Sequence, residues 1–169
     1  LEGDKTYYYV VRAYNEYGTS ANSNEISVTT TSAPPPPTIT VSTTELTGFG
    51  YVESSGPSSE KTFTISGSNL TANISIDAPT NYEISEDSGG SFSAEDPLVL
   101  TPSVGSVSET TIYVRLKAGL SAGNYNNENI TASSTGATSK TVTCSGTVYK
   151  PPEPSNHCSN FAAANGTDP

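Results

Sequence analysis

The sequence predicts an all-β protein, and three observations lead to this expectation. Ten tyrosines and four phenylalanines lie mostly in short segments in which apolar and polar residues alternate, as in strands with one solvated face. Turn signals such as Ser-Gly, Gly-Gly and Ala-Pro-Thr-Asn separate these segments at intervals typical of a sandwich. No window shows helical periodicity of useful length, and the high content of Ser, Thr and Asn suits wet strand faces.

The charge of the chain argues against one class of function. The net charge is −10, and the seven basic residues are spread singly along the sequence. Because nucleic-acid binding needs clustered Lys and Arg to neutralise phosphates, we expect no nucleic acid as a partner of this segment. No apolar run approaches the roughly 18 residues of a membrane helix, so we expect no membrane partner. The chain starts at Leu1 and has no Met, so we expect it to be part of a longer protein.

The first predicted element is a hairpin. Strand alternation places Tyr7 and Tyr9 on one face and Tyr8 on the other. Turn chemistry follows at residues 15–18, and alternation resumes through Val28. Since a lone hairpin is only marginally stable in water, we expect it to belong to a sheet whose other strands lie upstream.

The hairpin carries a spaced set of residues, namely Leu1, Tyr7, Tyr9, Val11, Ala13, Asn15, Gly18 and Ser20. With these positions, residues 1–30 resemble the last two strands of a fibronectin type III domain. The resemblance implies a tyrosine corner, in which the Tyr7 hydroxyl bonds back to the upstream backbone, with Leu1 as the other corner residue. Gly3 and Asp4 depart from the Pro-Gly often found between them. The resemblance also implies that Tyr7 and Tyr9 face a core and Tyr8 faces outward; the alternative is a ligand platform made of the three rings.

A proline-rich linker is expected at residues 32–37, after a first module that ends at residue 31. Its four prolines at 34–37 favour an extended polyproline II conformation, which acts as a stiff spacer of about 3 Å per residue. An SH3-type ligand is the alternative, but the segment lacks the flanking basic residue that such ligands use.

Residues 38–149 are expected to form a complete β domain. Its predicted strands are residues 38–42, 61–67, 73–79, 82–85, 97–102, 110–118, 128–134 and 140–148, and residues 119–125 are predicted as a loop. About eight short strands over ~110 residues fit the size of an immunoglobulin-like β-sandwich. The predicted core comprises Phe63, Ile65, Ile74, Ile76, Ile84, Leu98, Leu100, Ile112, Val114, Leu116, Ile130 and Val142.

Two stretches of this domain, FTISGSNLTANISIDAPTNYEISEDSGG and IYVRLKAGLSAGNY, carry a second resemblance. With them, residues 45–148 look like an immunoglobulin-like repeat of large secreted bacterial proteins. Such repeats often sit beside fibronectin type III modules, lamin-tail-like modules or extracellular nuclease domains. The resemblance implies an accessory role in a secreted or cell-surface protein, with no catalytic residues to carry over. A linker at 150–156 and the start of a further fibronectin-like module at 157–169 complete the expected organisation.

Few residues offer chemistry. The one histidine, His157, lies at the edge of a predicted linker, so we expect no nucleophile–base pair, no zinc site, no cofactor and no enzymatic activity. Alternation places Cys144 in the sandwich core, and Cys158 stands where an apolar residue is expected. Two interpretations of this pair stay open. Either both thiols are buried and unpaired, or Cys144 and Cys158 form a disulfide that clamps two modules together.

The segment YEISEDSGGSFSAED is the weak candidate for a metal site. Its carboxylates Glu86, Asp87, Glu95 and Asp96 offer the hard oxygen ligands that calcium takes. The spacing matches no calcium loop, and a solvated acidic loop is the alternative.

Tyrosines are the candidates for ligand binding, because exposed rings can stack on sugars. Tyr82 and Tyr113 are the predicted contact residues, and Tyr8, Tyr14, Tyr51 and Tyr125 belong to the same class. No Trp is present to strengthen such a platform.

The function predicted from these observations is that of a non-catalytic spacer module, which presents other domains of a secreted or cell-surface bacterial protein. Its expected partners are the neighbouring domains of the same chain, together with a glycan or a surface protein. The alternatives are an adhesion module that binds carbohydrate or protein, and an accessory part of an extracellular enzyme such as a nuclease or glycan hydrolase.

Overall fold

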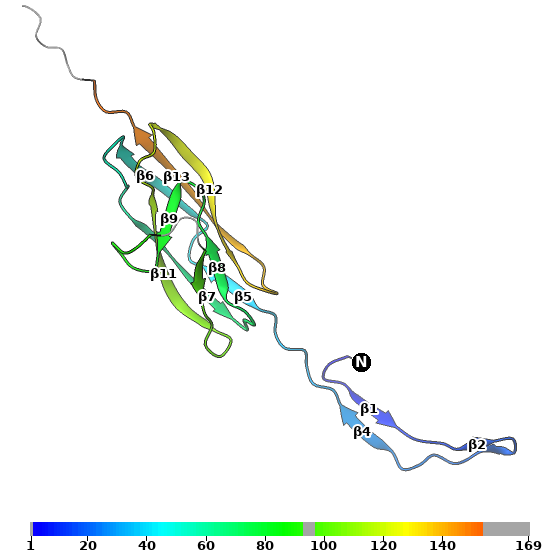
Figure 1. Ribbon diagram of the computed structural model, residues 1–169. Helices are drawn as coiled ribbons and strands as arrows, with labels where there is room; N and C mark the ends of the chain where they lie inside the picture. The colour runs from blue at the N-terminus through cyan, green and yellow to red at the C-terminus, as the bar shows by residue number, and fades with distance from the viewer. Residues whose placement is uncertain (1, 93–96, 154–169) are drawn as a thin grey trace, which may run out of the picture. The chain divides into compact units, whose positions relative to one another are not determined.

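The computed structural model describes residues 2–92 and 97–153, and each regular element within them is a β-strand (Figure 1). The chain divides into two compact units, which are residues 1–36 (unit 1) and the residues from Pro37 onward (unit 2). Among the described residues there is no helix that could cross a membrane.

Unit 1 is a hairpin of four short strands: β1 (Thr6–Tyr9), β2 (Tyr14–Asn15), β3 (Gly18–Thr19) and β4 (Ile26–Thr29). β1 pairs with β4, and β2 pairs with β3, both antiparallel. Tyr7 lies opposite Val28 and Tyr9 lies opposite Ile26, so these four side chains share one face of the two-stranded sheet, as the alternation predicted.

The Tyr7 hydroxyl accepts a hydrogen bond from the backbone N–H of Glu2 at 3.0 Å. This is the upstream backbone bond that the fibronectin resemblance implied, whereas Leu1 lies outside the described residues. Tyr9 was expected in a core, but 46% of its surface is exposed. The reason is that no described strand of unit 1 covers the face of the β1–β4 sheet.

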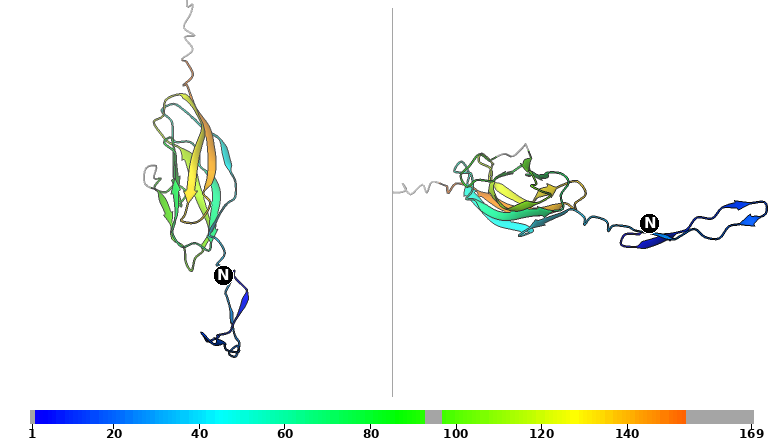
Figure 2. Two further views of the ribbon diagram at one scale, coloured as in Figure 1. Left: turned by 90° about the vertical axis from the view of Figure 1, so that its right-hand side faces the viewer. Right: turned by 90° about the horizontal axis from the view of Figure 1, so that it is seen from below.

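Unit 2 is an immunoglobulin-like β-sandwich of two sheets that pack face to face (Figure 2). One sheet has the strand order β10-β8-β12-β13-β6, and the other has the order β5-β7-β11-β9. The strands are β5 (Thr38–Val41), β6 (Glu45–Val52), β7 (Lys61–Ser68), β8 (Ile74–Asp77), β9 (Tyr82–Ser85), β10 (Leu98–Leu100), β11 (Val107–Leu116), β12 (Gly123–Ser133) and β13 (Lys140–Tyr149).

All eight strands predicted for this domain are present, but the sequence pattern missed β6 and cut β12 short. Gly48 and Gly50 interrupt the alternation in β6, and Gly48 adopts a φ of 73° that a regular strand does not use. β6 is held by parallel pairing with β13, the last strand of the domain. β12 begins at Gly123, so residues 123–125, predicted as loop, belong to a strand.

The core confirms the alternation in the predicted strands. Eleven of the twelve predicted core residues are buried, and Leu98 is partly buried against the same cluster. The cluster also contains residues that the pattern did not assign, which are Ile39, Phe49, Tyr51, Leu70, Tyr82, Val107, Ala132 and Val148.

Tyr82 links the two sheets through the core. Its ring is fully buried and meets Phe49 of β6 edge to face, with the ring centroids 5.1 Å apart. Its hydroxyl donates to the backbone carbonyl of Tyr125 on β12 at 2.7 Å. A side chain at Gly146 would place its Cβ 2.8 Å from Phe49 and 3.0 Å from the Tyr82 hydroxyl, so only glycine fits beside this contact.

Tyr51 makes a similar contact at the end of β6. Its hydroxyl donates to the carbonyl of Lys117 at 2.6 Å and accepts from the N–H of Leu120 at 3.2 Å. Tyr51 and Tyr82 were predicted as exposed sugar-stacking residues, and that prediction is wrong because their rings lie in the core. Each hydroxyl satisfies a backbone group, which allows a tyrosine to be buried without an unpaired polar atom.

A strained turn joins β10 to β11. Ser103 and Ser106 exchange two backbone hydrogen bonds of 2.8 and 3.0 Å, and Val104 and Gly105 between them have φ angles of 50° and 74°. Two residues at positive φ make this a type I′ turn, which favours Asn-Gly. Val104 is β-branched and fully exposed, so it has the wrong side chain for its backbone conformation and gains nothing from burial.

We predict that Tyr82→Phe lowers the free energy of unfolding by about 1–3 kcal/mol, because it leaves the buried Tyr125 carbonyl without its donor. Urea unfolding of the full chain measures this change. Tyr113→Phe is the matched control and should change stability little, since Tyr113 is a half-buried tyrosine of β11 whose hydroxyl makes no hydrogen bond within residues 2–92 and 97–153. Equal losses in both variants would contradict the role given to the Tyr82 hydroxyl.

We also predict that Val104→Asn raises the free energy of unfolding by about 1 kcal/mol, because Asn tolerates the left-handed conformation that strains valine. The melting temperature of the full chain should rise accordingly. Val99→Asn, at an exposed position in regular strand β10, should give no gain. A Val104→Asn protein that is no more stable than the unsubstituted chain would show that the turn is unstrained.

Candidate functional site

The candidate site is the surface around the β9–β10 loop, where Glu86, Asp87 and Tyr113 lie among the residues predicted to bind calcium or sugar. Glu83 and Ser85 alternate with the core residues Tyr82 and Ile84, so they lie on the outer face of the four-stranded sheet, where Ser85 is nevertheless buried. Tyr113 and Arg115 project from the same face of the neighbouring β11, because Tyr113 pairs with Ser85 and Arg115 pairs with Glu83. The described part of the loop, residues 86–92, covers this face.

Arg115 fastens the loop to the sheet. Its Nε donates to a carboxylate oxygen of Glu83 at 2.6 Å, and its guanidinium carbon lies 3.8 Å from the centroid of the Phe92 ring. Planar guanidinium groups stack on aromatic faces in this way. The charge of Arg115 is therefore matched inside the protein by Glu83, and the loop residue Phe92 covers it.

Glu60 holds the turn of the loop from the other side. One carboxylate oxygen accepts from the N–H of Gly89 and the other accepts from the Ser88 hydroxyl, both at 2.8 Å. The backbone hydrogen bond from Gly89 is the largest cause that lowers the pKa of Glu60, and Ser88 and Arg115 act in the same direction. The loop is thus tied by two side chains, Glu60 and Arg115.

Two of the four predicted calcium ligands lie within the described residues, and two lie outside them. Glu86 and Asp87 are adjacent and exposed, whereas Glu95 and Asp96 lie outside the described residues. Within residues 2–92 and 97–153, no three His, Cys, Asp or Glu side chains come close enough together to hold a metal ion. Two other carboxylates of this region, those of Glu60 and Glu83, are engaged in hydrogen bonds that shape the surface. Calcium binding by the set of four stays a prediction.

Of the two predicted ligand-binding tyrosines, Tyr113 lies half-buried on the candidate surface, whereas Tyr82 lies in the core. Alternation places Tyr82 on the same face as the predicted core residue Ile84, two positions further along the strand, so the sequence did carry the signal for its burial. The most exposed aromatic residues lie elsewhere, at Tyr14 and Tyr17 of unit 1. The sequence signal that could have found Tyr17 is its place inside a tight turn, where side chains point away from any core.

Cys144 is a core residue, as alternation predicted, and forms no disulfide with a described residue. Burial raises the pKa of its thiol to about 12, and the negative charge of Glu128 acts in the same direction. The thiol therefore stays protonated at neutral pH and is a poor nucleophile. Cys158, its predicted alternative partner, lies outside the described residues, so the disulfide stays a prediction.

Shifted pKa values mark the titratable groups whose surroundings differ most from water. A general acid–base pair needs a titratable group poised near neutral pH and within reach of a substrate. The three described groups with clearly shifted pKa values are Glu60, Tyr82 and Cys144, and each shift moves the pKa of its group away from neutrality.

No family model and no curated protein sequence matches the chain. Solved structures match as follows. The seventh PapD-like (ASH) domain of human CEP192 is 12% identical, with a TM-score of 0.43, and the match covers 73% of this chain and 94% of that domain. The CooA pilin subunit of enterotoxigenic Escherichia coli is 10% identical, with a TM-score of 0.40, and coverages of 68% and 99%.

A family 123 glycoside hydrolase from Clostridium perfringens is also 10% identical, with a TM-score of 0.42. The match covers 71% of this chain but only 28% of the enzyme, so it concerns a minor part of that protein. These likenesses are at the level of the β fold alone. The sandwich assignment itself rests on the two sheets and the shared core described above.

We predict that acid releases the loop from Glu60. The folded pKa of Glu60 lies below its ordinary value of about 4.5, so the hydrogen bonds stabilise the loop above that ordinary value and are lost as the pH falls through the folded pKa. The chemical shift of the Gly89 amide, followed by NMR from pH 7 to pH 2, should titrate with that low pKa. The Glu60→Gln variant should lack this titration, and Glu45→Gln, an exposed control, should keep it. A Gly89 titration that persists in Glu60→Gln would contradict the assignment.

Proposed function

We propose that this chain is a non-catalytic spacer of a secreted or cell-surface multidomain bacterial protein, and that it holds other domains of that protein at a distance. Unit 2 serves as an immunoglobulin-like repeat, and unit 1 serves as the end of a fibronectin type III domain, as the two resemblances imply. The proposal is supported by the way in which unit 2 is built to resist tension.

The pairing of β6 with β13 is the observation that carries the proposal. β6 lies near the start of unit 2 and β13 is its last described strand, yet the two are neighbours and run in the same direction over seven residue pairs, from Glu45 beside Thr143 to Val52 beside Tyr149 (Figure 1). The chain therefore approaches this strand pair at one end and leaves it at the other.

This geometry distributes force. A pull applied between the start of β6 and the end of β13 acts along both strands in opposite directions. All the inter-strand hydrogen bonds are then loaded together, and none can break before its neighbours. Where both ends of a strand pair are pulled from the same side, the bonds open one after another and each carries the whole force in turn.

Further contacts stiffen the end of unit 2 at which β13 finishes. The N–H of Glu53 donates to the Tyr149 carbonyl at 2.8 Å, which extends the pairing past β6. A carboxylate oxygen of Glu53 accepts from the N–H of Ala122 at 3.0 Å. Ser58 exchanges two hydrogen bonds with Leu116, one from its backbone and one to its hydroxyl. The loops at this end are therefore fastened to one another as well as to the sheet.

The proline-rich segment supports the same role. The prolines at 34–37 restrict the backbone to extended conformations and limit how far adjacent modules can collapse on one another. The alternatives of an adhesion module or an accessory part of an extracellular nuclease or glycan hydrolase are compatible with such a spacer, since in each the chemistry lies in other domains or on added surfaces.

We predict that unit 2 unfolds at a several-fold higher force when pulled through residues 44 and 150 than through residues 55 and 150. The first pair of handles shears β6 against β13, and the second pair, which lies at one end of the strands, unzips them. Single-molecule force spectroscopy on Thr44→Cys or Ser55→Cys combined with Lys150→Cys, in a Cys158→Ser background, measures both directions.

The positions chosen for the handles are exposed, and Cys144 is fully buried, so labelling is directed to the handles. Chemical unfolding of the two labelled proteins is the control, and it should give equal stability. Equal unfolding forces in the two directions would remove the support that the strand pairing gives to the spacer role.

A further inference from the structure

The tip of the unit 1 hairpin is built by residues other than its tyrosines. The side-chain oxygen of Asn15 accepts from the N–H of Tyr17 at 2.9 Å, and Gly18 adopts a φ of 144°. Ser20 closes the base, because its hydroxyl accepts from the N–H of Ala13 at 3.0 Å and its N–H donates to the Ala13 carbonyl at 2.9 Å. The fold of the tip therefore needs only the polar and small residues.

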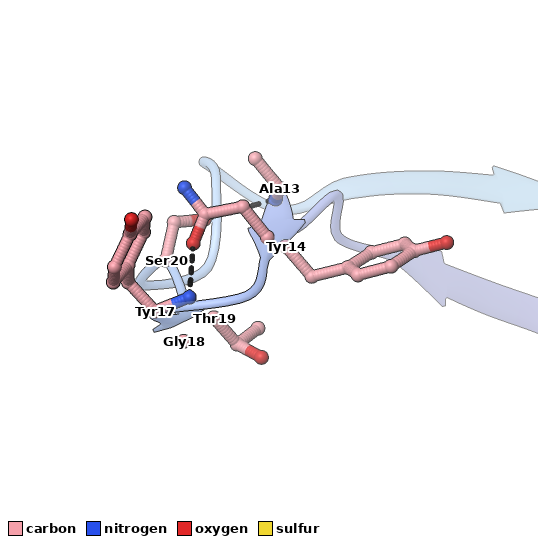
Figure 3. A pocket seen from close by; sticks show the side chains of 7 residues that line it. Ala13, Tyr14, Tyr17, Gly18, Thr19 and Ser20 are labelled. Carbon is pink, nitrogen blue, oxygen red and sulfur yellow. Dashed lines mark hydrogen bonds between the residues drawn. The ribbon is translucent and has the colours of Figure 1, made fainter.

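The two tyrosines of the tip contribute little packing. Tyr14 and Tyr17 are 87% and 90% exposed, and neither hydroxyl makes a hydrogen bond with a described residue. Their rings project to opposite sides of the turn (Figure 3). By contrast, the hydroxyls of Tyr51 and Tyr82 in unit 2 satisfy buried backbone groups. Two large rings that the local fold does not use are candidates for contact with a ligand.

The surroundings of the rings are polar and uncharged. A hollow of about 320 Å³ at the tip is lined by Asn15, Thr19 and Ser20 together with the two tyrosines and small residues, and this volume is at the lower end of the range for small-ligand sites. Glu16 is the only charged residue in the turn, while the guanidinium of Arg12 bonds to the side chain of Asn22.

We propose that the tip, residues 13–20, binds a neutral glycan, with the rings of Tyr14 and Tyr17 packing against sugar faces and the Asn15 side-chain NH2 and the Thr19 hydroxyl meeting sugar hydroxyls. This role goes beyond that of a spacer and does not depend on it. Tyrosine combines a rigid apolar ring with a polar end, and together with Ser, Gly and Asn it forms adaptable recognition loops.

The net charge of the chain and the small size of the tip favour a neutral glycan over other classes of ligand. A chain with a net charge of −10 and no free cluster of cations repels polyanions, which disfavours acidic glycans and nucleic acids. A specific protein partner typically covers about 800 Å² of each surface, which is more than a tip of eight residues with divergent rings offers. A sugar chain needs only single-ring contacts and scattered hydrogen bonds.

The test uses the full chain and soluble neutral probes, namely the hexasaccharides of cellulose, chitin, mannan and laminarin, with titration followed by NMR. We expect saturable binding of at least one probe, with shifts confined to the tip and unaffected by salt. The Tyr14→Thr/Tyr17→Thr double variant should bind about tenfold or more weakly, as the loss of two stacking contacts implies.

Tyr8→Thr is the matched control, because Tyr8 is an exposed tyrosine of the same unit that lies outside the tip, and it should bind like the unsubstituted chain. The β1–β4 amide shifts report whether each variant keeps the hairpin. Absence of binding to all four probes would overturn the proposal. So would shifts outside the tip, an equal loss in Tyr8→Thr, or binding only to an acidic glycan or to a protein.

Discussion

The burial of Tyr82 between the two sheets is the contact on which unit 2 depends. The ring starts from the edge strand of the four-stranded sheet and crosses the core, and its hydroxyl reaches a carbonyl of the five-stranded sheet. Phe49 packs on the ring, and Gly146 leaves the space that both require. Apolar packing is not directional and alone tolerates sliding of one sheet over the other. A buried hydrogen bond forms only when its donor and acceptor hold one relative position. The contact therefore fixes how the sheets face each other, and the strand ends and loops follow from it.

Several charged residues of the sandwich fasten loops. Arg115 is held between Glu83 and Phe92, and Glu60 binds the turn at residues 88–89. Glu128 accepts two hydrogen bonds from Asn81, which ties the turn before β9 to β12. A catalytic carboxylate must keep an oxygen free for substrate and a pKa near its working pH. These acceptors are committed to backbone and side-chain donors, which accords with a structural role for the described surface.

Two tyrosines of unit 2 and two tyrosines of unit 1 are used in opposite ways. In unit 2, the rings of Tyr51 and Tyr82 lie in the core and their hydroxyls satisfy backbone groups. In unit 1, Tyr14 and Tyr17 stand on a turn that folds without them. With unit 2 as the proposed spacer and the tip of unit 1 as the proposed glycan site, one unit would maintain a span under tension and the other would offer a point of attachment.

The sequence by itself determined the fold class, most of the strands and eleven of the buried core positions, because period-two alternation is a local property that reflects one dry face and one wet face. Only the tertiary structure decided the rest. β6 was invisible because glycines break its alternation, and its pairing is with a strand at the other end of the domain. The site residues were the least predictable part. Alternation assigns a tyrosine to a face, but whether that face is covered depends on strands distant in sequence, which bury Tyr82 and leave Tyr9 exposed.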